Sequence, residues 1–366
     1  MTTRRQFIRT TAAGAAVLAA GTAAFPNLII PKKKDRLGVA LIGLGYYSRD
    51  LLAPALQATK KCYLAGIVTG SPEKAKQWQE KHGIPDKNVY NYDNFDSIAD
   101  NPDIDVVYVV LPNNLHKEFT LRGARAGKHI WCEKPMAMNA AECRDMIKGC
   151  KDNKVKLSIG YRMQHEPNTQ EIIRYGKEKT LGAVRLVTAS AGFRDSRTDH
   201  WRLKKAMGGG AMFDMGVYSL NAARYATSEE PIGVTAQQFT TRPELYSEVD
   251  ETMLFQLEFP SGALANCSTS FGMGMNTLHT VCEKGWYRLD PFQAYRGVQG
   301  VTSTGKALNV DTPNEQAKQM DEDAIAIMDN TDVLVPGEEG LRDMIVVDAI
   351  YQSVKEGRRI PVLSGR

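Results

Sequence analysis

The stretch from Leu37 to Ser48 reads LGVALIGLGYYS and decides the fold of the first half of the chain. Its first six residues form an apolar run of strand length, and a helical pattern of leucine and alanine follows the stretch. A glycine turn between a strand and a helix is the context that a dinucleotide-binding fingerprint requires. Gly43 permits the tight turn, Gly45 lets the backbone approach a pyrophosphate, and the helix start offers free N–H groups to phosphate oxygens. Ser48 replaces the usual third glycine, so a plain structural turn is the alternative.

Strands and helices alternate after this turn. Apolar or β-branched runs predict strands at 63–68, 105–111 and 128–132, and helical patterns cover 73–82 and 116–126. Such alternation is typical of a doubly wound parallel sheet. The sequence therefore predicts an α/β Rossmann domain over residues 36–160.

The end of the second predicted strand bears on the choice of cofactor. An acidic residue there would bind the ribose 2′-hydroxyl and favour NAD. The segment 69–74 reads TGSPEK, with no acid directly after the strand. Its hydroxyls and Lys74 suit a 2′-phosphate better, so the sequence favours NADP, and NAD is possible. The alternative is that Lys74 is only a solvated helix residue and that Glu73 binds the ribose.

The periodicity changes from about residue 181. Strands are predicted at 184–189, 252–259, 263–271 and 286–289, and a Pro-Ser-Gly turn joins the second to the third. Strands joined by short turns imply an open, mainly antiparallel sheet. A terminal helix is predicted over 340–356, with Leu341, Ile345, Val346, Ala349 and Ile350 facing inward. We expect residues 161–366 to form an α+β domain.

Composition narrows the function classes. The chain has 366 residues and a formal net charge of +4, which is too small an excess to indicate nucleic-acid binding. The six cysteines form no CxxC pair and are expected to be small buried side chains rather than a disulfide framework. No metal site is expected.

The first thirty residues resemble a targeting signal rather than part of the folded domain. Residues 3–9 read TRRQFIR, a twin-arginine pattern, and an alanine-rich apolar run follows over 11–25. The run is too short to span a bilayer comfortably, so residues 1–30 are predicted to be a twin-arginine signal peptide, with a polar linker at 32–35. A Sec signal or an amphipathic segment is the alternative. The mature protein is expected in the periplasm, without a stable membrane span.

Several spaced motifs resemble the glucose–fructose oxidoreductase/inositol dehydrogenase family, often called Gfo/Idh/MocA. The resemblance runs from about Leu37 to the C-terminus. Its motifs are the 69–76 segment, CEKPM at 132–136, GYR at 160–162, GGGAMFDMGVY at 208–218 and PGEEG at 336–340. The resemblance implies that Lys134 lies at the nicotinamide and that Asp214 and Tyr218 reach the cleft from the second domain. Many members carry histidine where this chain has Tyr218, and tyrosine there resembles the glucose–fructose oxidoreductase branch.

The chemistry of these three side chains supports a catalytic role independently of the family resemblance. Tyrosine is a weak acid in water, and a nearby ammonium such as Lys134 stabilises the phenolate that would act as a base. An aspartate can fix a sugar hydroxyl through a charge-assisted hydrogen bond. The alternatives are that Glu133-Lys134-Pro135 is a surface turn and that Asp214 and Tyr218 are a helix-start acid and a core tyrosine.

The candidate site therefore has a catalytic and a cofactor-binding part. The catalytic candidates are Lys134, Asp214 and Tyr218. His116 is either a cofactor contact or a structural, capping residue, and Arg162, Trp201 and Arg202 either line the cleft or serve packing. The candidates for cofactor binding are Gly43, Leu44, Gly45, Tyr46, Tyr47, Thr69, Gly70, Ser71, Lys74, Tyr92, Leu111, Pro112, Asn113, His116, Glu133, Lys134, Arg162, Trp201 and Arg202.

The resemblance implies an exported, NADP-dependent oxidoreductase that moves hydride between a pyranose sugar and a tightly bound nicotinamide, which a second sugar or carbonyl would reoxidise. A glycoside hydrolase that uses transient oxidation and a non-catalytic sugar-binding protein are the alternatives. A homodimer or homotetramer is expected by analogy. The loops at 193–203 and 287–300 would decide which sugar is bound, but their sequences contain no motif that identifies the sugar.

Overall fold

The computed structural model describes residues 34–363, and from Arg36 onward the chain forms one compact unit. The predicted signal peptide lies outside the described residues. Among residues 34–363, no helix combines the length and the apolar character that a membrane crossing needs. All six cysteines are buried, as expected.

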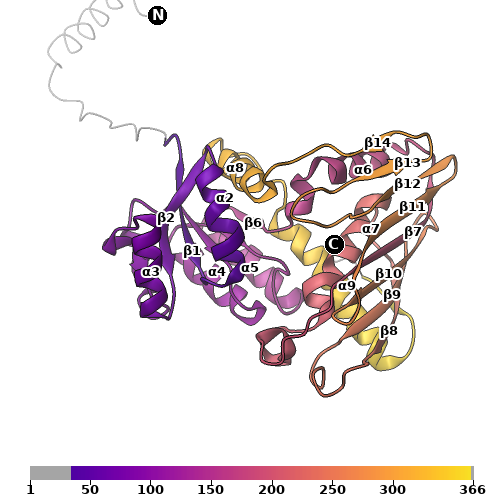
Figure 1. Ribbon diagram of the computed structural model, residues 1–366, viewed down its shortest axis with the longest axis horizontal. Coiled ribbons are helices and arrows are strands. Elements are labelled where there is room, and N and C mark those ends of the chain that lie inside the picture. The colour runs from indigo at the N-terminus through magenta and orange to yellow at the C-terminus, as the bar shows by residue number, and fades with distance from the viewer. Residues whose placement is uncertain (1–33, 364–366) are drawn as a thin grey trace, which may run out of the picture. The chain divides into compact units, whose positions relative to one another are not determined.

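The first part of this unit is built on a parallel sheet of six strands (Figure 1). The strand order is β3-β2-β1-β4-β5-β6, so the chain reverses direction across the sheet between β1 and β4. Ligands bind at such a reversal, outside the carboxyl ends of the strands. The strands are β1 (Leu37–Ile42), β2 (Cys62–Val68), β3 (Val89–Tyr90), β4 (Val106–Val109), β5 (His129–Cys132) and β6 (Leu157–Ile159).

Side chains of this sheet alternate between two helical layers. In β1, Val39 and Leu41 pack into one apolar cluster, whereas Ala40 and Ile42 pack into the other. The first cluster includes residues of α2 (Ala53–Ala58) and α3 (Pro72–His82), and the second includes residues of α4 (His116–Arg125) and α5 (Ala140–Asp152). The prediction of a doubly wound Rossmann fold is confirmed.

A late helix, α8 (Glu315–Met328), returns to this first sheet and lies beside α2 (Figure 1). Its Ala317, Met320 and Ala324 join the same apolar cluster as Val39. The Asp321 carboxylate accepts the backbone N–H groups of residues 60 and 61 at 2.7–3.0 Å. The sequence did not predict this helix, which packs the later part of the chain against the parallel-sheet domain.

The second sheet has nine strands in the order β14-β13-β12-β11-β7-β10-β9-β8-β15. Every pair is antiparallel except β7 and β10, which run parallel because the chain reaches β10 through other elements. The expected mainly antiparallel sheet is confirmed. The strands are β7 (Val184–Gly192), β8 (Gly233–Phe239), β9 (Thr252–Glu258), β10 (Leu264–Ser270), β11 (Met275–Cys282), β12 (Gly285–Leu289), β13 (Gly300–Thr302), β14 (Ala307–Leu308) and β15 (Ile360–Pro361).

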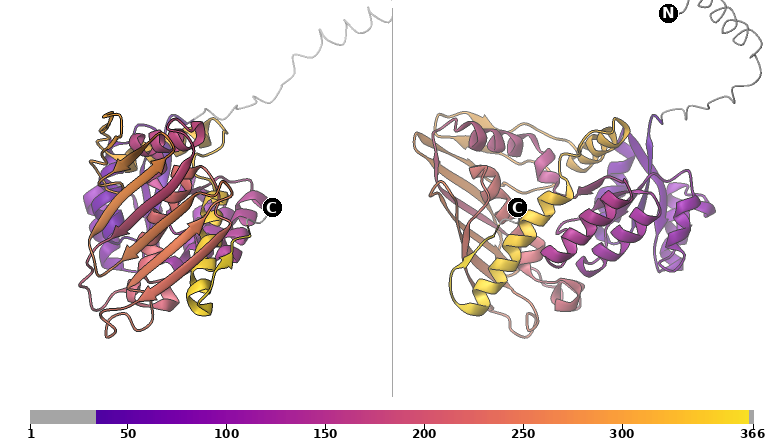
Figure 2. Two further views of the ribbon diagram at one scale, coloured as in Figure 1. Left: turned by 90° about the vertical axis from the view of Figure 1, so that its right-hand side faces the viewer. Right: turned by 180° about the vertical axis from the view of Figure 1, so that it is seen from behind.

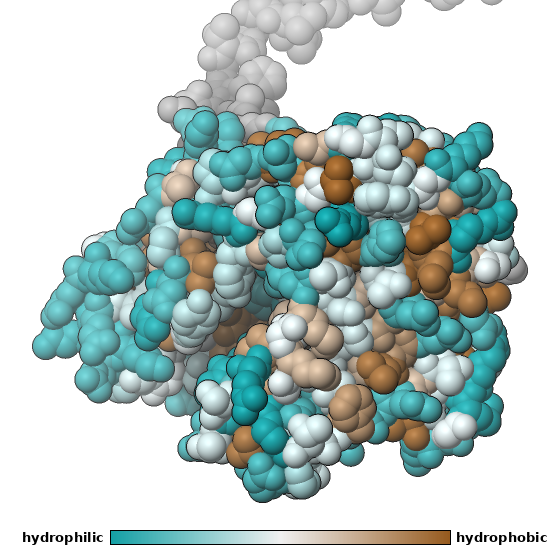
Figure 3. Space-filling model, turned by 45° about the vertical axis from the view of Figure 1, so that its right-hand side comes forward, coloured by the Kyte–Doolittle hydropathy of each residue, from teal (hydrophilic) through white to brown (hydrophobic). Residues whose placement is uncertain are grey.

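Helices cover only one face of this sheet. α6 (Pro167–Glu178), α7 (Val217–Thr227) and α9 (Gly337–Glu356) lie behind it when it is seen face-on (Figure 2). The predicted inward residues of the terminal helix are all buried or half-buried. The outer face carries exposed leucines on three neighbouring strands, Leu186, Leu254 and Leu264, and apolar side chains gather where this face comes forward in Figure 3.

Candidate active site

The glycine turn after β1 has the geometry that a pyrophosphate needs. Gly43 has a φ of +89°, and a Cβ there would collide with the carbonyl oxygen of Val110. A Cβ at Gly45 would meet no described atom within 4 Å, so the backbone is open to a ligand there. Ser48 stands at the position where the fingerprint usually has its third glycine. Its hydroxyl donates a hydrogen bond to the Gly43 carbonyl at 2.6 Å and so links the two ends of the turn. The residues present therefore fit a dinucleotide.

The segment after β2 lies next to this turn because β1 and β2 are paired. Ser71 caps α3, since its hydroxyl oxygen accepts the Lys74 N–H at 3.3 Å, and the Thr69 hydroxyl accepts the Ser71 N–H at 3.2 Å. A Cβ on Gly70 would lie 3.0 Å from the Tyr92 ring, so Tyr92 packs directly against this glycine. The segment after β2 therefore groups two hydroxyls, those of Thr69 and Ser71, with the exposed Lys74 at the N-terminus of an eleven-residue helix.

A cavity of about 630 Å³ lies where the carboxyl ends of the parallel strands face the second sheet. The space-filling view shows the surface hollowed between the two halves (Figure 3). Its lining includes all three catalytic candidates and many of the cofactor candidates: Tyr46, Tyr47, Leu111, Asn113, Glu133, Lys134, Trp201, Arg202, Asp214 and Tyr218. The structure therefore brings together residues that are up to 172 positions apart, from Tyr46 to Tyr218.

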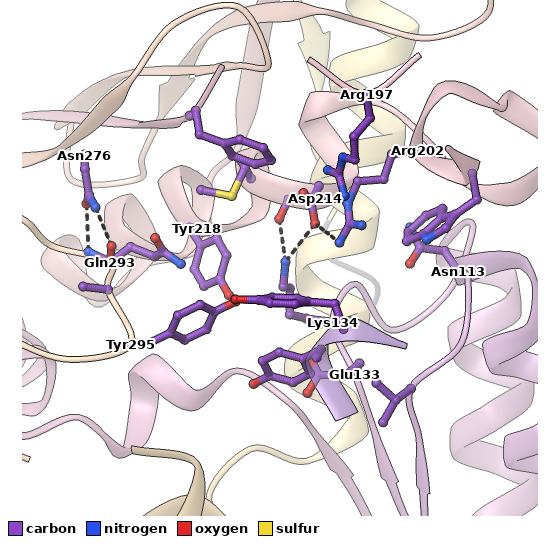
Figure 4. A pocket seen from close by; sticks show the side chains of 18 of the residues that line it. Asn113, Glu133, Lys134, Arg197, Arg202, Asp214, Tyr218, Asn276, Gln293 and Tyr295 are labelled. Atoms are coloured by element: carbon purple, nitrogen blue, oxygen red, sulfur yellow. Dashed lines mark hydrogen bonds and ion pairs between the residues drawn. The ribbon is translucent and has the colours of Figure 1, made fainter. Parts of the chain in front are cut away.

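Lys134, Asp214 and Tyr218 meet in the middle of this cavity (Figure 4). The Lys134 ammonium donates to the backbone carbonyl of Asp214 at 2.5 Å and lies 3.5 Å from its carboxylate. The same ammonium lies 4.6 Å from the centre of the Tyr218 ring. Lys134 follows β5, whereas the other two come from a helix of the second domain, so the chemistry is assembled across the two sheets.

Arg202 completes an ion cluster around Asp214. Its Nε lies 2.9 Å from Asp214 Oδ2, and its guanidinium stacks 4.6 Å above the Trp201 ring. Burial raises the pKa of the Asp214 carboxyl, but the charges of Arg202 and Lys134 outweigh burial and hold that pKa at about 2. Asp214 is therefore a carboxylate at every working pH, and it fixes Lys134 from one side.

The helix that carries Asp214 and Tyr218 begins with a π-helical turn, η8 (Met212–Gly216), which leads into α7. A second π-helical turn, η1 (Ser48–Leu52), starts the helix after the glycine turn, and such turns are frequent at functional sites. The start of η8 is held by Asp250, whose carboxylate accepts the Met212 N–H at 2.6 Å and the hydroxyl of Tyr351 at 2.7 Å.

The structure places His116 and Arg162 beneath the cavity wall, fully buried and bound to protein groups. The two ring nitrogens of His116 lie 2.9 Å from the carbonyl oxygens of Pro135 and Leu111, so the side chain ties together two strand-end loops. Burial lowers the pKa of His116. Arg162 pairs with Glu315 at 2.5 Å. Neither residue lines the cavity, although the buried Nε and Nη2 of Arg162 have no hydrogen-bond partner among residues 34–363.

Glu133 belongs to the same buried layer although it also reaches the cavity. It accepts a hydrogen bond from the Tyr108 hydroxyl at 2.7 Å, and burial raises the pKa of its carboxyl. Tyr46, by contrast, is 61% exposed at the mouth of the cavity, while Tyr47 lies deeper.

Sequence reasoning missed several residues that line the cavity. The loop after β7 adds Phe193 and Arg197, and β11 and the loop after β12 add Asn276, Gln293 and Tyr295. Most of them lie in the two loops that were expected to decide the sugar. The sequence indicated that these loops border the substrate site, but it did not indicate which of their residues line the cavity.

Comparison with known proteins agrees with this architecture. The model of an oxidoreductase family with an NAD-binding Rossmann fold, GFO/IDH/MocA, matches residues 37–161, and the model of its C-terminal domain matches residues 169–288. A D-xylose 1-dehydrogenase [NADP(+)] from Haloarcula marismortui is 27% identical over 86% of this chain and 90% of its own length. A trans-1,2-dihydrobenzene-1,2-diol dehydrogenase from Xenopus laevis is 30% identical over 69% of this chain and 73% of its own.

A solved structure, the aldose-aldose oxidoreductase from Caulobacter crescentus complexed with glycerol, is 41% identical to this chain. The match covers 89% of this chain and 99% of that one, with a TM-score of 0.86. The family models, the identity to these enzymes and the geometry of the glycine turn agree. The chain belongs to the Gfo/Idh/MocA family of NAD(P)-dependent oxidoreductases.

Proposed function

We propose that this protein oxidises the anomeric carbon of a cyclic aldose and passes the hydride to a nicotinamide dinucleotide that stays bound. The observation that carries the proposal is the position of the Lys134 ammonium, 4.6 Å from the Tyr218 ring inside the cavity that borders the glycine turn. The 41% identity to an aldose-aldose oxidoreductase supports an aldose as substrate.

In the proposed reaction, Tyr218 in its phenolate form takes the proton of the anomeric hydroxyl. The Lys134 ammonium stabilises the phenolate, and Asp214 with Arg202 keeps that ammonium in place. Bound nicotinamide supplies the acceptor for the hydride that leaves the anomeric carbon, and the sugar becomes a lactone. A second aldose or carbonyl compound then takes the hydride back, and Tyr218 returns the proton.

We propose NADP as the dinucleotide. The turn from Gly43 to Ser48 would hold the pyrophosphate, and Ser71 and Lys74 at the start of α3 would hold the 2′-phosphate. A phosphate at a helix N-terminus is favoured by the free N–H groups and the helix dipole. The relative from Haloarcula marismortui is named for NADP as well.

The test is to purify the protein, denature it and measure the dinucleotide that is released. The proposal predicts close to one NADP per chain and a change of nicotinamide absorbance when an aldose is added to the native protein without free cofactor. Protein that is nearly empty and turns over only with added NAD would contradict both the retained cofactor and its identity.

We also propose export by the twin-arginine route, which carries folded proteins and suits an enzyme that leaves with its cofactor. The proposal rests on Arg4, Arg5 and the apolar run at 11–25. Replacing both arginines with lysine should leave the protein in the cytoplasm, as cell fractionation would measure.

Self-association through the outer face of the nine-stranded sheet is a further part of the proposal. Leu186 and Leu264 face each other on β7 and β10 and are 36% and 39% exposed. An apolar patch of this kind is typical of protein–protein contacts. Light scattering should give the mass of a dimer or tetramer, and Leu186→Glu should give a monomer.

A further inference from the structure

The loop between β12 and β13, residues 290–299, forms one wall of the cavity. Figure 4 shows Gln293 and Tyr295 on the same side as Tyr218 and away from Arg202 and Asn113. Within residues 34–363, neither the Gln293 side-chain amide nor the Tyr295 hydroxyl takes part in a hydrogen bond. Two neutral groups that can both donate and accept hydrogen bonds are therefore presented to a ligand.

The backbone that carries these side chains is held rigidly by Asn276 on β11. The Asn276 side-chain oxygen accepts the N–H groups of Phe292 and Gln293 at 3.1 and 2.9 Å, and its side-chain nitrogen donates to the Gln293 carbonyl at 2.5 Å. Three hydrogen bonds from one amide thus fix two successive residues. The backbone at Gln293 therefore needs little further ordering when a ligand binds.

The next two residues of the loop, Ala294 and Tyr295, contact the buried Arg162. Arg162 donates to the carbonyl of Ala294 at 2.7 Å, and its guanidinium lies 4.8 Å from the Tyr295 ring and 5.8 Å from the Tyr218 ring. The Tyr295 ring also lies 6.1 Å from the Tyr47 ring on the glycine-turn helix. The distance between loop and reacting groups is therefore set by one buried arginine.

The Tyr295 hydroxyl is suited to hydrogen bonding rather than to proton abstraction. Burial and the neighbouring Tyr218 raise the pKa of the Tyr295 hydroxyl, and the positive charge of Arg162 does not offset them. The group stays a neutral phenol at working pH. It can donate a hydrogen bond to a sugar oxygen, but it cannot serve as a second base.

We propose that Gln293 and Tyr295 bind the hydroxyl groups of the sugar that lie away from the reacting carbon, and so select among aldoses. On the opposite wall, Asp214, Lys134 and Arg202 form ion pairs with one another and hold the reacting groups. An epimer whose hydroxyl points elsewhere would leave the amide unpaired in a partly buried site, which costs affinity. This inference rests on the proposed aldose oxidation.

The test uses the full-length enzyme with its bound dinucleotide and a panel of glucose, mannose, galactose and xylose. We compare wild type with Gln293→Leu, which keeps the size of the side chain and removes the amide, and with Tyr295→Phe. Gln299→Leu is the matched control, because Gln299 lies in the same loop, is exposed and does not line the cavity.

For the preferred aldose, Gln293→Leu should lower kcat/KM by about 10-fold to 100-fold, mostly through KM. The ratio of kcat/KM between the preferred aldose and its epimer should fall in Gln293→Leu and Tyr295→Phe and stay unchanged in Gln299→Leu. Unchanged ratios in an active Gln293→Leu enzyme would overturn the inference and leave the proposed function standing. If the wild type oxidises none of the aldoses, the proposed function itself fails.

Asn276 provides a second test as a positioning residue. In Asn276→Ala the loop loses its three hydrogen bonds, so selectivity among aldoses should fall as it does in Gln293→Leu. In the double variant the two effects should not add, since both act through the same amide. Additive losses would show that Asn276 acts on selectivity independently of Gln293 and would overturn its role as the residue that positions this amide.

Discussion

The two walls of the cavity hold polar side chains in opposite ways. On one wall, Lys134, Asp214 and Arg202 are charged, and each is paired with another member of the cluster. On the other wall, Gln293 and Tyr295 are neutral, and no described residue hydrogen-bonds to their side-chain ends. Charges that satisfy one another hold reacting groups in one geometry, whereas neutral groups with free hydrogen-bonding capacity are available to a ligand.

This difference divides catalysis from recognition. Substitutions on the charged wall should lower turnover for every sugar, because they act on the transition state. Substitutions on the neutral wall should change which sugar is preferred.

The largest effect is expected for Tyr218→Phe. Removal of the general base should lower kcat by about 10²-fold to 10⁴-fold, while the content of bound dinucleotide stays the same. Steady-state kinetics on the preferred aldose measure the change, and Tyr295→Phe is the matched control with a small effect on kcat. A larger loss of kcat in Tyr295→Phe than in Tyr218→Phe would reverse the assignment of the two walls.

Lys134→Met should have the next largest effect, a loss of about 100-fold in kcat at neutral pH. Without the ammonium a phenolate is harder to form, so the activity of the variant should rise further into the alkaline range than that of the wild type. A pH–rate profile of both proteins tests this. Profiles of the same shape would exclude Lys134 as the group that stabilises the phenolate.

Asp214→Asn should lower kcat by about 10-fold, because Lys134 loses the carboxylate that fixes it, and should also reduce stability. The pKa of Asp214 is about 2 in the folded protein against an ordinary value of 3.8. A lowered carboxyl pKa contributes stability that is present above 3.8 and is lost as the pH falls towards 2. The wild type should therefore exceed the variant by about 2 kcal/mol at neutral pH and by less at pH 3.

Denaturant unfolding at the two pH values measures this difference. A difference that grows as the pH falls would contradict the assigned ion cluster.

The smallest effect is expected far from both walls, at Asp323 on α8. Burial raises the pKa of this carboxyl to about 6, one of its oxygens has no hydrogen-bond partner within residues 34–363, and the other accepts the Ser158 hydroxyl at 2.8 Å. A raised carboxyl pKa gives stability that is complete below 3.8 and is lost as the pH rises through 6. Asp323→Asn should thus stabilise the protein by about 1–2 kcal/mol at pH 8 and by less at pH 5.

Asp321→Asn, on the same helix, is the control and should give no gain that grows with pH. An Asp323→Asn variant that is less stable than the wild type at pH 8 would show that the folded protein stabilises the charged carboxylate of Asp323.

On the charged wall, the strand pattern indicated the position of Lys134, the family resemblance indicated Asp214, and Arg202 was left open; nothing in the sequence indicated the neutral wall. Lys134 follows a buried strand and a glycine turn marks the sheet edge, and the carboxyl ends of parallel strands meet at one edge. Gln293 reaches the cavity only because Asn276, on another strand, binds the backbone of its loop. A contact of this kind depends on the register of the sheet and leaves no pattern along the chain.

Helix α8 escaped prediction for a related reason. The side that faces the protein carries buried polar residues, including Glu315, Gln319 and Asp323, so its sequence resembles an exposed helix or loop. Its place is set by partners such as Arg162 and Ser158, which are more than 150 positions away. Strands β1, β2, β4, β5, β7, β9, β10 and β12 and helix α9 lie close to their predicted positions, whereas β8 and β11 were not predicted.

The proposed reaction requires that hydride leaves the sugar's anomeric carbon for a dinucleotide beside Lys134 and Tyr218. The direct test is to mix the purified protein, without added cofactor, with an aldose that carries deuterium at the anomeric carbon, and to measure the mass of the dinucleotide released on denaturation. We expect one deuterium on the dinucleotide from the wild type and none from Tyr218→Phe on the same time scale. Consumption of the sugar with the label found in water or retained in the product, and an unlabelled dinucleotide, would contradict it.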